Sequence, residues 1–219
     1  METDAGPSRP EIADLDGGPT PSAPEPAAAA AIATGDPPGH GRFPRWRIAL
    51  LLIVLALLML AFLRRFEYQI PQWLAGDPPK ADAVLVEKSA RRLSLIRDGA
   101  PYRSWRIALG GNPIGHKQRE GDLRTPEGHY VLDWRNPGSC CYRSLHVSYP
   151  NDTDRAAAAE RGDDPGGLIM IHGQVNGRGW LGWLLQYIDH THGCIAVRNV
   201  PMEVIWRAVD DGTPVEIRP

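Results

Sequence analysis

The sequence has almost no net charge and few cysteines. Its 219 residues carry 24 Lys and Arg against 26 Asp and Glu, which leaves a formal net charge of −2. So small a charge gives no electrostatic reason to expect a nucleic-acid partner, and none is predicted. The three cysteines include no CxxC pair, and no HExxH sequence occurs, so two common signatures of a zinc site are missing.

Internal repeats and long amphipathic helices are also missing, whereas proline and glycine are abundant. The chain has 21 prolines and 23 glycines, too many for a compact helical bundle. Part of this excess lies in residues 1–45, which are rich in Pro, Ala, Gly and acidic residues and offer little to bury. Such a segment cannot compensate the entropy lost on ordering, so residues 1–45 are predicted to be a disordered leader.

A run of sixteen residues without a polar side chain follows, from Ile48 to Leu63. As a helix it would span about 24 Å at 1.5 Å per residue, somewhat less than a hydrocarbon core of roughly 30 Å. Flanking aromatic residues and arginines extend it to membrane length, because they suit the membrane interface. These flanking residues are Trp46, Phe66, Tyr68, Arg47, Arg64 and Arg65. Residues 46–66 are therefore predicted to form one transmembrane helix.

Two alternatives exist for this helix. A cleaved signal peptide would need a small-x-small site after the apolar run, but Phe62, Leu63 and three further large residues follow instead. A buried core helix is disfavoured by the arginines at both ends. Three arginines precede the helix and two follow it, which favours a cytoplasmic N-terminus only weakly.

Residues 67–81 contain two proline sites and are predicted to be a linker, so the folded domain is expected over residues 82–219. Short runs of Val, Leu and Ile alternate with polar residues between Gly-containing breaks, which is typical of hairpin-connected strands. The expected strands are AVLVEKS, RRLSLIRDG, SWRIALG, HYVLDWR, RSLHVSYP and TPVEIRP. Helices are expected at Asp152–Arg161, Trp180–Asp189 and Val200–Val209, the last with Asn199 as its cap. The predicted fold class is mainly β with short helices.

Two short motifs carry the candidate chemistry, IMIHG at Ile169–Gly173 and THGC at Thr191–Cys194. A cysteine becomes a nucleophile as its thiolate, and a nearby imidazole is the usual base that removes the thiol proton. His172 and Cys194 are 22 positions apart, so they can meet only in the folded chain. On these two residues alone, a buried structural cysteine and a core histidine are an equally good interpretation. A zinc site made by His172, His190, His192 and Cys194 is a further alternative.

The ordered set of motifs resembles the YkuD-type L,D-transpeptidases. The resemblance rests on IMIHG followed by THGC and on GGNPIGHKQREGDLRTPEGHYVLD upstream, and it covers nearly all of residues 82–219. Many family members have an arginine two places after the cysteine, whereas here Ala196 and Val197 intervene before Arg198. The Gly-Cys-Ile-Ala sequence looks like the murein-transpeptidase branch, in which some relatives hydrolyse bonds to peptidoglycan.

The resemblance implies an L,D-transpeptidase-like β-sandwich in which Cys194 is the nucleophile and His172 the base. It further implies that backbone amides near Gly193 and Cys194 hold the oxyanion, that His192 supports the site, and that Gly173 contacts substrate. Arg198 is predicted to make a structural contact or to bind a substrate carboxylate, because a guanidinium suits carboxylates. No cofactor and no metal are implied. The implied substrates are peptidoglycan stem peptides, with a second stem, a lipoprotein lysine or water as acceptor. The catalytic domain would then lie in the periplasm, anchored to the inner membrane. A catalytically silent wall-binding module is the remaining alternative.

Two further features have a plain and a functional interpretation. Cys140 and Cys141 are adjacent. We interpret them as two small residues at a position that varies in the family, and favour this over a vicinal disulfide or a redox link to Cys194. The segment WLGWLLQY, Trp180–Tyr187, has apolar residues on more than one face. It is predicted to be a core helix or a lid over the site, with contact to glycan or membrane as the alternative.

Overall fold

The structure is a computed structural model that describes residues 44–67 and 69–219. Residues 45–219 form one compact unit of the chain. The predicted leader lies outside the described residues apart from its last two positions, and so does Tyr68, one of the predicted interfacial aromatics.

The predicted transmembrane segment is a single helix, α1, from Arg45 to Phe66. Its 22 residues give a length of about 33 Å. The window Arg45–Arg64 has a mean hydropathy of 2.7, and none of it is buried in the protein. By length and composition α1 is able to cross a membrane. It is not the core helix considered as an alternative, because its apolar side chains contact no protein interior.

A second helix, α2, from Gln69 to Ala75, lies inside the segment predicted as a linker. Pro71 and Ala75 are buried, and α2 packs against the last helix of the domain, α5, from Asn199 to Ala208. The Arg207 guanidinium of α5 donates to the carbonyls of Gln72 at 3.2 Å and Gly76 at 2.8 Å. These contacts attach α2 to the folded domain, and they depend on a partner more than 130 positions away in the sequence.

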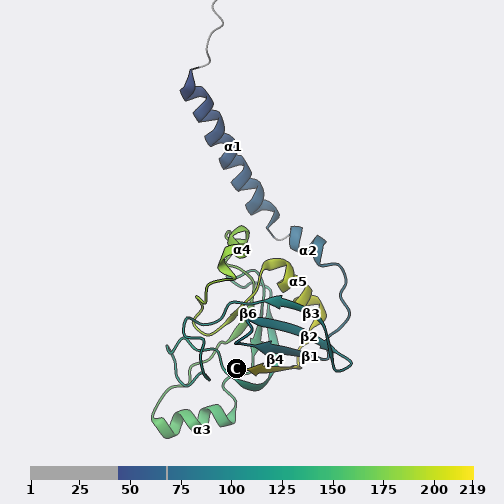
Figure 1. The fold of residues 1–219 in the computed structure, drawn as a ribbon, viewed down its shortest axis with the longest axis vertical. Helices are drawn as coiled ribbons and strands as arrows, with labels where there is room; N and C mark the ends of the chain where they lie inside the picture. The colour runs from purple at the N-terminus through teal and green to yellow at the C-terminus, as the bar shows by residue number, and fades with distance from the viewer. Residues whose placement is uncertain (1–43, 68) are drawn as a thin grey trace, which may run out of the picture. The chain divides into compact units, whose positions relative to one another are not determined.

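Eight strands form one sheet in the order β3-β2-β1-β8-β4-β5-β6-β7 (Figure 1). Neighbouring strands are antiparallel except for the β1–β8 and β6–β7 pairs, which are parallel. The strands are β1 Ala83–Glu87, β2 Arg92–Arg97, β3 Ala100–Arg106, β4 Gly128–Asn136, β5 Ser144–Val147, β6 Met170–His172, β7 Ile195–Ala196 and β8 Thr213–Arg218. This mainly β architecture with short helices is the predicted fold class. The run SWRIALG is strand only to Arg106.

The two edges of the sheet meet, so the sheet curls around its core. The chain that leaves β3 pairs with β7, since the amides of Ala108 and Ala196 each donate to the other residue's carbonyl, at 2.9 and 2.8 Å. The core lies inside the curl and draws on nearly every strand, because alternate strand residues point inward. Its fully buried members include Val86, Leu93, Leu95, Ile107, Leu109, Leu145, Ile171 and Ile195.

The helices between strands follow local signals to different degrees. Helix α3, from Asp152 to Arg161, has the predicted bounds, and Asn151 closes a capping box with Asp154. The predicted helix from 180 to 189 is a 3₁₀ turn, η1, from Gly179 to Leu181, followed by one turn of helix, α4, from Gly182 to Leu185. In α5 the prediction that Asn199 is the cap is wrong, because Arg198 is the cap residue. The Asn199 side chain instead accepts a hydrogen bond from the Gln174 amide at 2.8 Å.

Candidate active site

The parallel pairing of β6 with β7 brings the two motifs together. Ile171 lies opposite Ile195 and His172 opposite Ala196, and both isoleucines are fully buried in the core. Because alternate residues of a strand face opposite sides of a sheet, His172 points to the face away from these isoleucines. Cys194 immediately precedes β7, and the same alternation continued back by one residue would put its side chain on this face as well.

The orientation of His172 is set by the next residue in the chain. The ring Nδ1 of His172 lies 2.6 Å from the carbonyl oxygen of Gly173. Since a carbonyl can only accept, Nδ1 carries the hydrogen and the neutral ring keeps its free lone pair on Nε2. Burial lowers the pKa of His172, and the hydrogen bond to Gly173 offsets this only in part. The imidazole is therefore held in its basic, neutral form.

Cys194 is half-buried, and burial raises the pKa of its thiol above the ordinary value. A backbone hydrogen bond from Met170 acts in the opposite direction but is weaker. The thiol donates to the carbonyl of Leu168, with sulfur and oxygen 3.6 Å apart, and not to His172. The resting pair is thus a thiol and a neutral imidazole. In enzymes without bound substrate, catalytic hydrogen bonds are often long and tighten only when substrate binds.

The turn before Cys194 depends on Gly193 and Thr191. Gly193 has φ +122°, and a Cβ there would lie 2.6 Å from the carbonyl oxygen of Arg124, so only glycine fits. The Gly193 amide donates to Thr191 Oγ1 at 3.2 Å, and this hydroxyl donates to the Cys194 carbonyl at 2.7 Å. The Gly193 amide is therefore already in use. The Cys194 amide has no acceptor in the described part of the chain, so it is the amide that could face an oxyanion.

Comparison with known proteins agrees with this arrangement. Residues 81–217 match the family model YkuD, the L,D-transpeptidase catalytic domain. The chain belongs to this family. Its curated relatives include YafK of Escherichia coli (strain K12), named as a candidate L,D-transpeptidase, which is 34% identical over 130 residues. That match covers 56% of this chain and 48% of YafK, so the chain spans about half the length of the curated relatives it matches.

Solved structures with a similar fold include Pgp2, the helical cell shape determining protein of Campylobacter jejuni. It is 25% identical, with a TM-score of 0.46, and the match covers 67% of this chain and 55% of that one. An L,D-transpeptidase of Mycobacterium tuberculosis is 15% identical with a TM-score of 0.41, over 63% of this chain and 57% of the other.

For His192 and Gly173, two further predicted site residues of this L,D-transpeptidase domain, the structure gives less direct evidence of a role. His192 is exposed and makes no hydrogen bond in the described part of the chain. Gly173 is buried, and a Cβ there would lie 2.8 Å from Asn199 Oδ1 and from Tyr142 Cβ. The structure thus gives Gly173 a packing role and, through its carbonyl, an orienting role toward His172. Its contact with substrate stays a prediction, as does the supporting role of His192.

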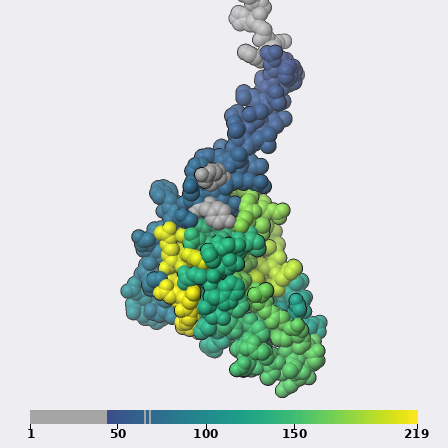
Figure 2. Space-filling view, turned by 180° about the vertical axis from the view of Figure 1, so that it is seen from behind, coloured from purple at the N-terminus to yellow at the C-terminus, as the bar shows by residue number. Residues whose placement is uncertain are grey.

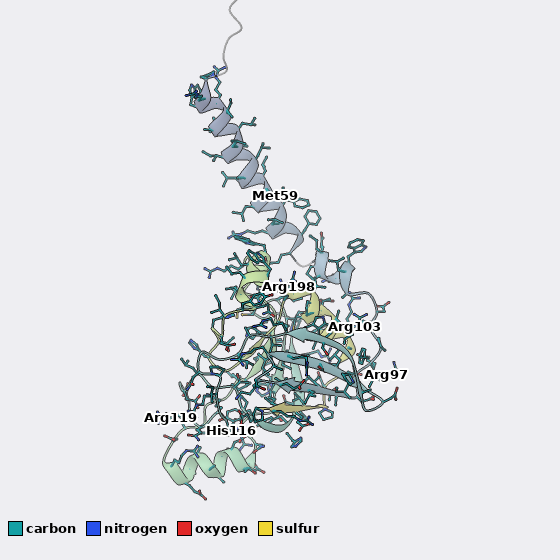
Figure 3. All side chains as sticks on the ribbon, viewed as in Figure 1. Met59, Arg97, Arg103, His116, Arg119 and Arg198 are labelled. Carbon is teal, nitrogen blue, oxygen red and sulfur yellow. The ribbon has the colours of Figure 1, made fainter. Side chains whose placement is uncertain are left out.

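Arg198 is exposed and lies at the start of α5, close to α4 (Figure 3). It lines one cavity with Trp105, Trp183 and Gln186, and a second with residues that include Glu67. Neither cavity is lined by His172 or Cys194. The contact of Arg198 with a substrate carboxylate stays a prediction.

The zinc alternative requires several His, Cys, Asp or Glu side chains close together. Across residues 44–67 and 69–219, no group of three or more His, Cys, Asp or Glu side chains is arranged to hold a metal ion. All three cysteines are free, and the sulfurs of Cys140 and Cys141 lie 2.9 Å apart. Burial, followed by the hydrogen bond to Cys140, raises the pKa of Cys141 to about 12. The Cys141 thiol is therefore a poor nucleophile at neutral pH.

Sequence reasoning assigned no role to Thr191 and none to the Gly173 carbonyl. Thr191 is present in the THGC motif, three places before the cysteine, so its hydroxyl could have been noted as a candidate to fix the turn. The role of the Gly173 carbonyl has no sequence signal, since every residue has a carbonyl and only the fold shows which one faces a ring nitrogen.

Proposed function

We propose that the protein is a membrane-anchored cysteine L,D-transpeptidase that acts on peptidoglycan stem peptides through a thioester on Cys194. One observation supports this most directly. Strand β6, which ends at His172, pairs with β7, which begins directly after Cys194, and the Gly173 carbonyl holds His172 Nδ1 so that Nε2 is the free base. Membership of the L,D-transpeptidase family supplies the class of reaction.

In the proposed first half-reaction, the Cys194 sulfur attacks the carbonyl carbon of an L,D-peptide bond, such as that between diaminopimelate and D-alanine. The pKa of the Cys194 thiol is raised and that of the His172 imidazole is lowered, so both groups are neutral at rest. The thiol proton therefore passes to His172 Nε2 only as the carbon–sulfur bond forms, and not before the attack. The Cys194 amide would stabilise the developing oxyanion. The imidazolium then protonates the leaving amine, and the terminal D-residue departs.

In the second half-reaction an amine attacks the thioester. The amine would come from a second stem peptide, which gives a cross-link, or from a lysine of an outer-membrane lipoprotein. His172 would take a proton from this amine and return it to the Cys194 sulfur as the thioester breaks. Water in place of the amine gives hydrolysis and makes the enzyme an L,D-carboxypeptidase or amidase.

The proposal includes the placement of the enzyme. Helix α1 would cross the inner membrane once, with residues 82–219 in the periplasm where the stem peptides are found. The length and hydropathy of α1 support this anchoring, and the location of the substrate supports the orientation. The test is protease accessibility of the domain in spheroplasts compared with lysed cells.

The reaction is tested with purified full-length protein in detergent, tetrapeptide muropeptides and mass spectrometry. We expect release of the terminal D-residue and a Cys194 acyl adduct, both lost in Cys194→Ala. Cys140→Ala is the matched control for loss of a thiol, because Cys140 is free and exposed and has no role in the proposed reaction. His172→Gln should slow the reaction by about 10²–10⁴-fold.

The products also distinguish the alternatives. Cross-linked dimers indicate transfer, and free tripeptide stems indicate hydrolysis. Unchanged product formation by Cys194→Ala would refute the thioester mechanism and favour a wall-binding module. One zinc ion bound per chain after purification, lost together with activity in Cys194→Ala, would favour the metal alternative instead.

A further inference from the structure

Two short segments of the domain expose large apolar side chains to solvent. In α2, Trp73 is 81% exposed and Leu74 53%. In the segment from η1 to Ile188, Trp183 is 61% and Tyr187 70% exposed. Scattered apolar side chains are normal on a protein surface, but a cluster of large ones indicates an interaction site. We refer to Ile70, Trp73 and Leu74 together with Trp180, Trp183 and Tyr187 as the aromatic surface.

The first of these segments is tied to the end of α1 by the chain itself. Helix α1 ends at Phe66 and α2 begins at Gln69, so their ends are at most about 11 Å apart. Helix α2 is in turn fixed to the domain through Arg207, which donates to the Gln72 and Gly76 carbonyls. If α1 crosses a bilayer, α2 must therefore lie at its surface and hold the domain there.

The second segment is tied to the same point by hydrogen bonds. The carboxylate of Glu67, the first residue after α1, accepts from the amide of Gly177 at 2.6 Å and from that of Gly179 at 2.9 Å. Gly179 is the first residue of η1, and a Cβ there would lie 2.6 Å from Glu67 Oε1. Glycine at this position allows the Trp-rich segment to approach the end of α1. Both parts of the aromatic surface thus lie at the end of the domain that carries α1, and α3 lies at the opposite end (Figures 1 and 2).

The charges beside this surface suit a phospholipid headgroup. A cavity between the end of α1 and the domain is lined by apolar side chains that include Leu63 and Trp180, and by Arg64 and Arg198. Neither arginine has an ion-pair partner within residues 44–67 and 69–219. Guanidinium groups bind phosphate oxygens well, and Trp and Tyr favour the interface between headgroups and acyl chains.

We propose that the aromatic surface docks the domain onto the lipid bilayer that α1 spans, with Trp73 and Trp183 in the interfacial layer and Arg64 and Arg198 facing lipid phosphates. The inference rests on the proposed membrane anchoring. It gives Arg198 a lipid contact in place of the predicted substrate contact. It also means that the face bearing His172 and Cys194 stays at a fixed distance from the membrane instead of moving on a flexible tether.

Photo-crosslinking in the full-length protein tests the proposal. The photoreactive residue p-benzoylphenylalanine replaces one residue at a time, and each variant is reconstituted in vesicles of phosphatidylcholine and phosphatidylglycerol. Trp73 and Trp183 report docking. Trp46, at the start of α1, reports insertion of the helix. Arg119 is the matched negative position, because it is exposed and lies near α3, at the other end of the domain from Arg198 (Figure 3).

We expect lipid adducts at positions 46, 73 and 183 and only background at position 119. Adducts at 46 alone would overturn docking while leaving anchoring intact, and equal adducts at 73, 183 and 119 would show a freely moving domain and also overturn it. Absence of adducts at 46 would contradict the anchoring itself. Crosslinking of positions 73 and 183 to glycan strands of added sacculi, without lipid adducts, would assign the aromatic surface to peptidoglycan.

Discussion

The turn before the candidate nucleophile gives a quantitative prediction. Gly193 has φ +122°, and a Cβ would lie 2.6 Å from the Arg124 carbonyl oxygen and 3.1 Å from Ile169 Cδ1. In Gly193→Ala the backbone strain costs about 1–3 kcal/mol, and the forced contact with backbone costs about 1–3 kcal/mol more. We expect the free energy of unfolding to fall by about 2–6 kcal/mol, and the Tm by about 4–24 °C for a domain of this size.

Two other glycines separate the two causes. Gly212 has φ +90°, and a Cβ there would meet nothing within 4 Å, so Gly212→Ala adds strain without a contact. Gly173 has an ordinary φ, but its Cβ would lie 2.8 Å from Asn199 Oδ1 and Tyr142 Cβ, so Gly173→Ala adds contacts without strain. Thermal unfolding of the three full-length variants in detergent, followed by near-UV circular dichroism, should give the largest loss for Gly193→Ala. A loss no greater than that of Gly212→Ala would refute the reasoning.

Three further predictions concern titration, capping and a buried charge. Burial raises the pKa of the Cys194 thiol, so the rate of its alkylation by iodoacetamide should keep rising with pH beyond the range of an ordinary cysteine. Mass spectrometry of the modified peptide measures this rate, and a rate that levelled off below neutral pH would contradict the prediction. Asn151→Ala removes the side chain that accepts from the Asp154 amide at 3.0 Å, so it should cost about 0.5–2 kcal/mol in thermal unfolding, whereas Asn151→Asp should cost less because it can still accept. The Lys88 side chain is 2% exposed, and its ammonium contacts the Glu127 carboxylate at 2.7 Å and also donates to the carbonyls of Gly115 and Thr125. Glu127→Leu removes the carboxylate, so denaturant unfolding should show a loss of about 3–5 kcal/mol, while a loss below about 1 kcal/mol would mean that the two carbonyls suffice.

The elements that the sequence predicts well carry their signals locally. Strand β1, AVLVE, is a short run of apolar residues, and β2, RLSLIR, mixes apolar and polar residues within six positions. Helix α3 begins at an Asn with an Asp three places later. Helix α2 has no such signal. Its sequence QIPQWLA contains a proline and follows a predicted membrane helix, and it is held by Arg207 of α5. Residues whose structure depends on a distant partner are the ones that a local pattern misses.

The same distinction applies to the site. His172 and Cys194 can be named from their motifs, because the residue types and their order are specific. Their relative placement cannot be named, since it depends on the parallel register of β6 and β7. For Arg198 the prediction and the structure point to different surroundings. The sequence predicts a substrate contact, whereas the structure places the arginine at cavities next to α4 and the end of α1. A motif thus identifies the residue types that could react, and the register of the β6–β7 pair decides which of these residues lie near one another.

The position of Cys194 follows from closure of the whole sheet. Strand β7 has only two residues, too few to hold its own place. It is paired with β6 on one side and with Ala108 on the other, and Ile195 and Val197 are fully buried in the core. The turn at Gly193 therefore depends on the pairing of β7 with the chain that follows β3. For this reason the position of Cys194 is set by contacts that span almost the entire domain, and substitutions near Ala108 should affect Cys194 reactivity without touching the thiol.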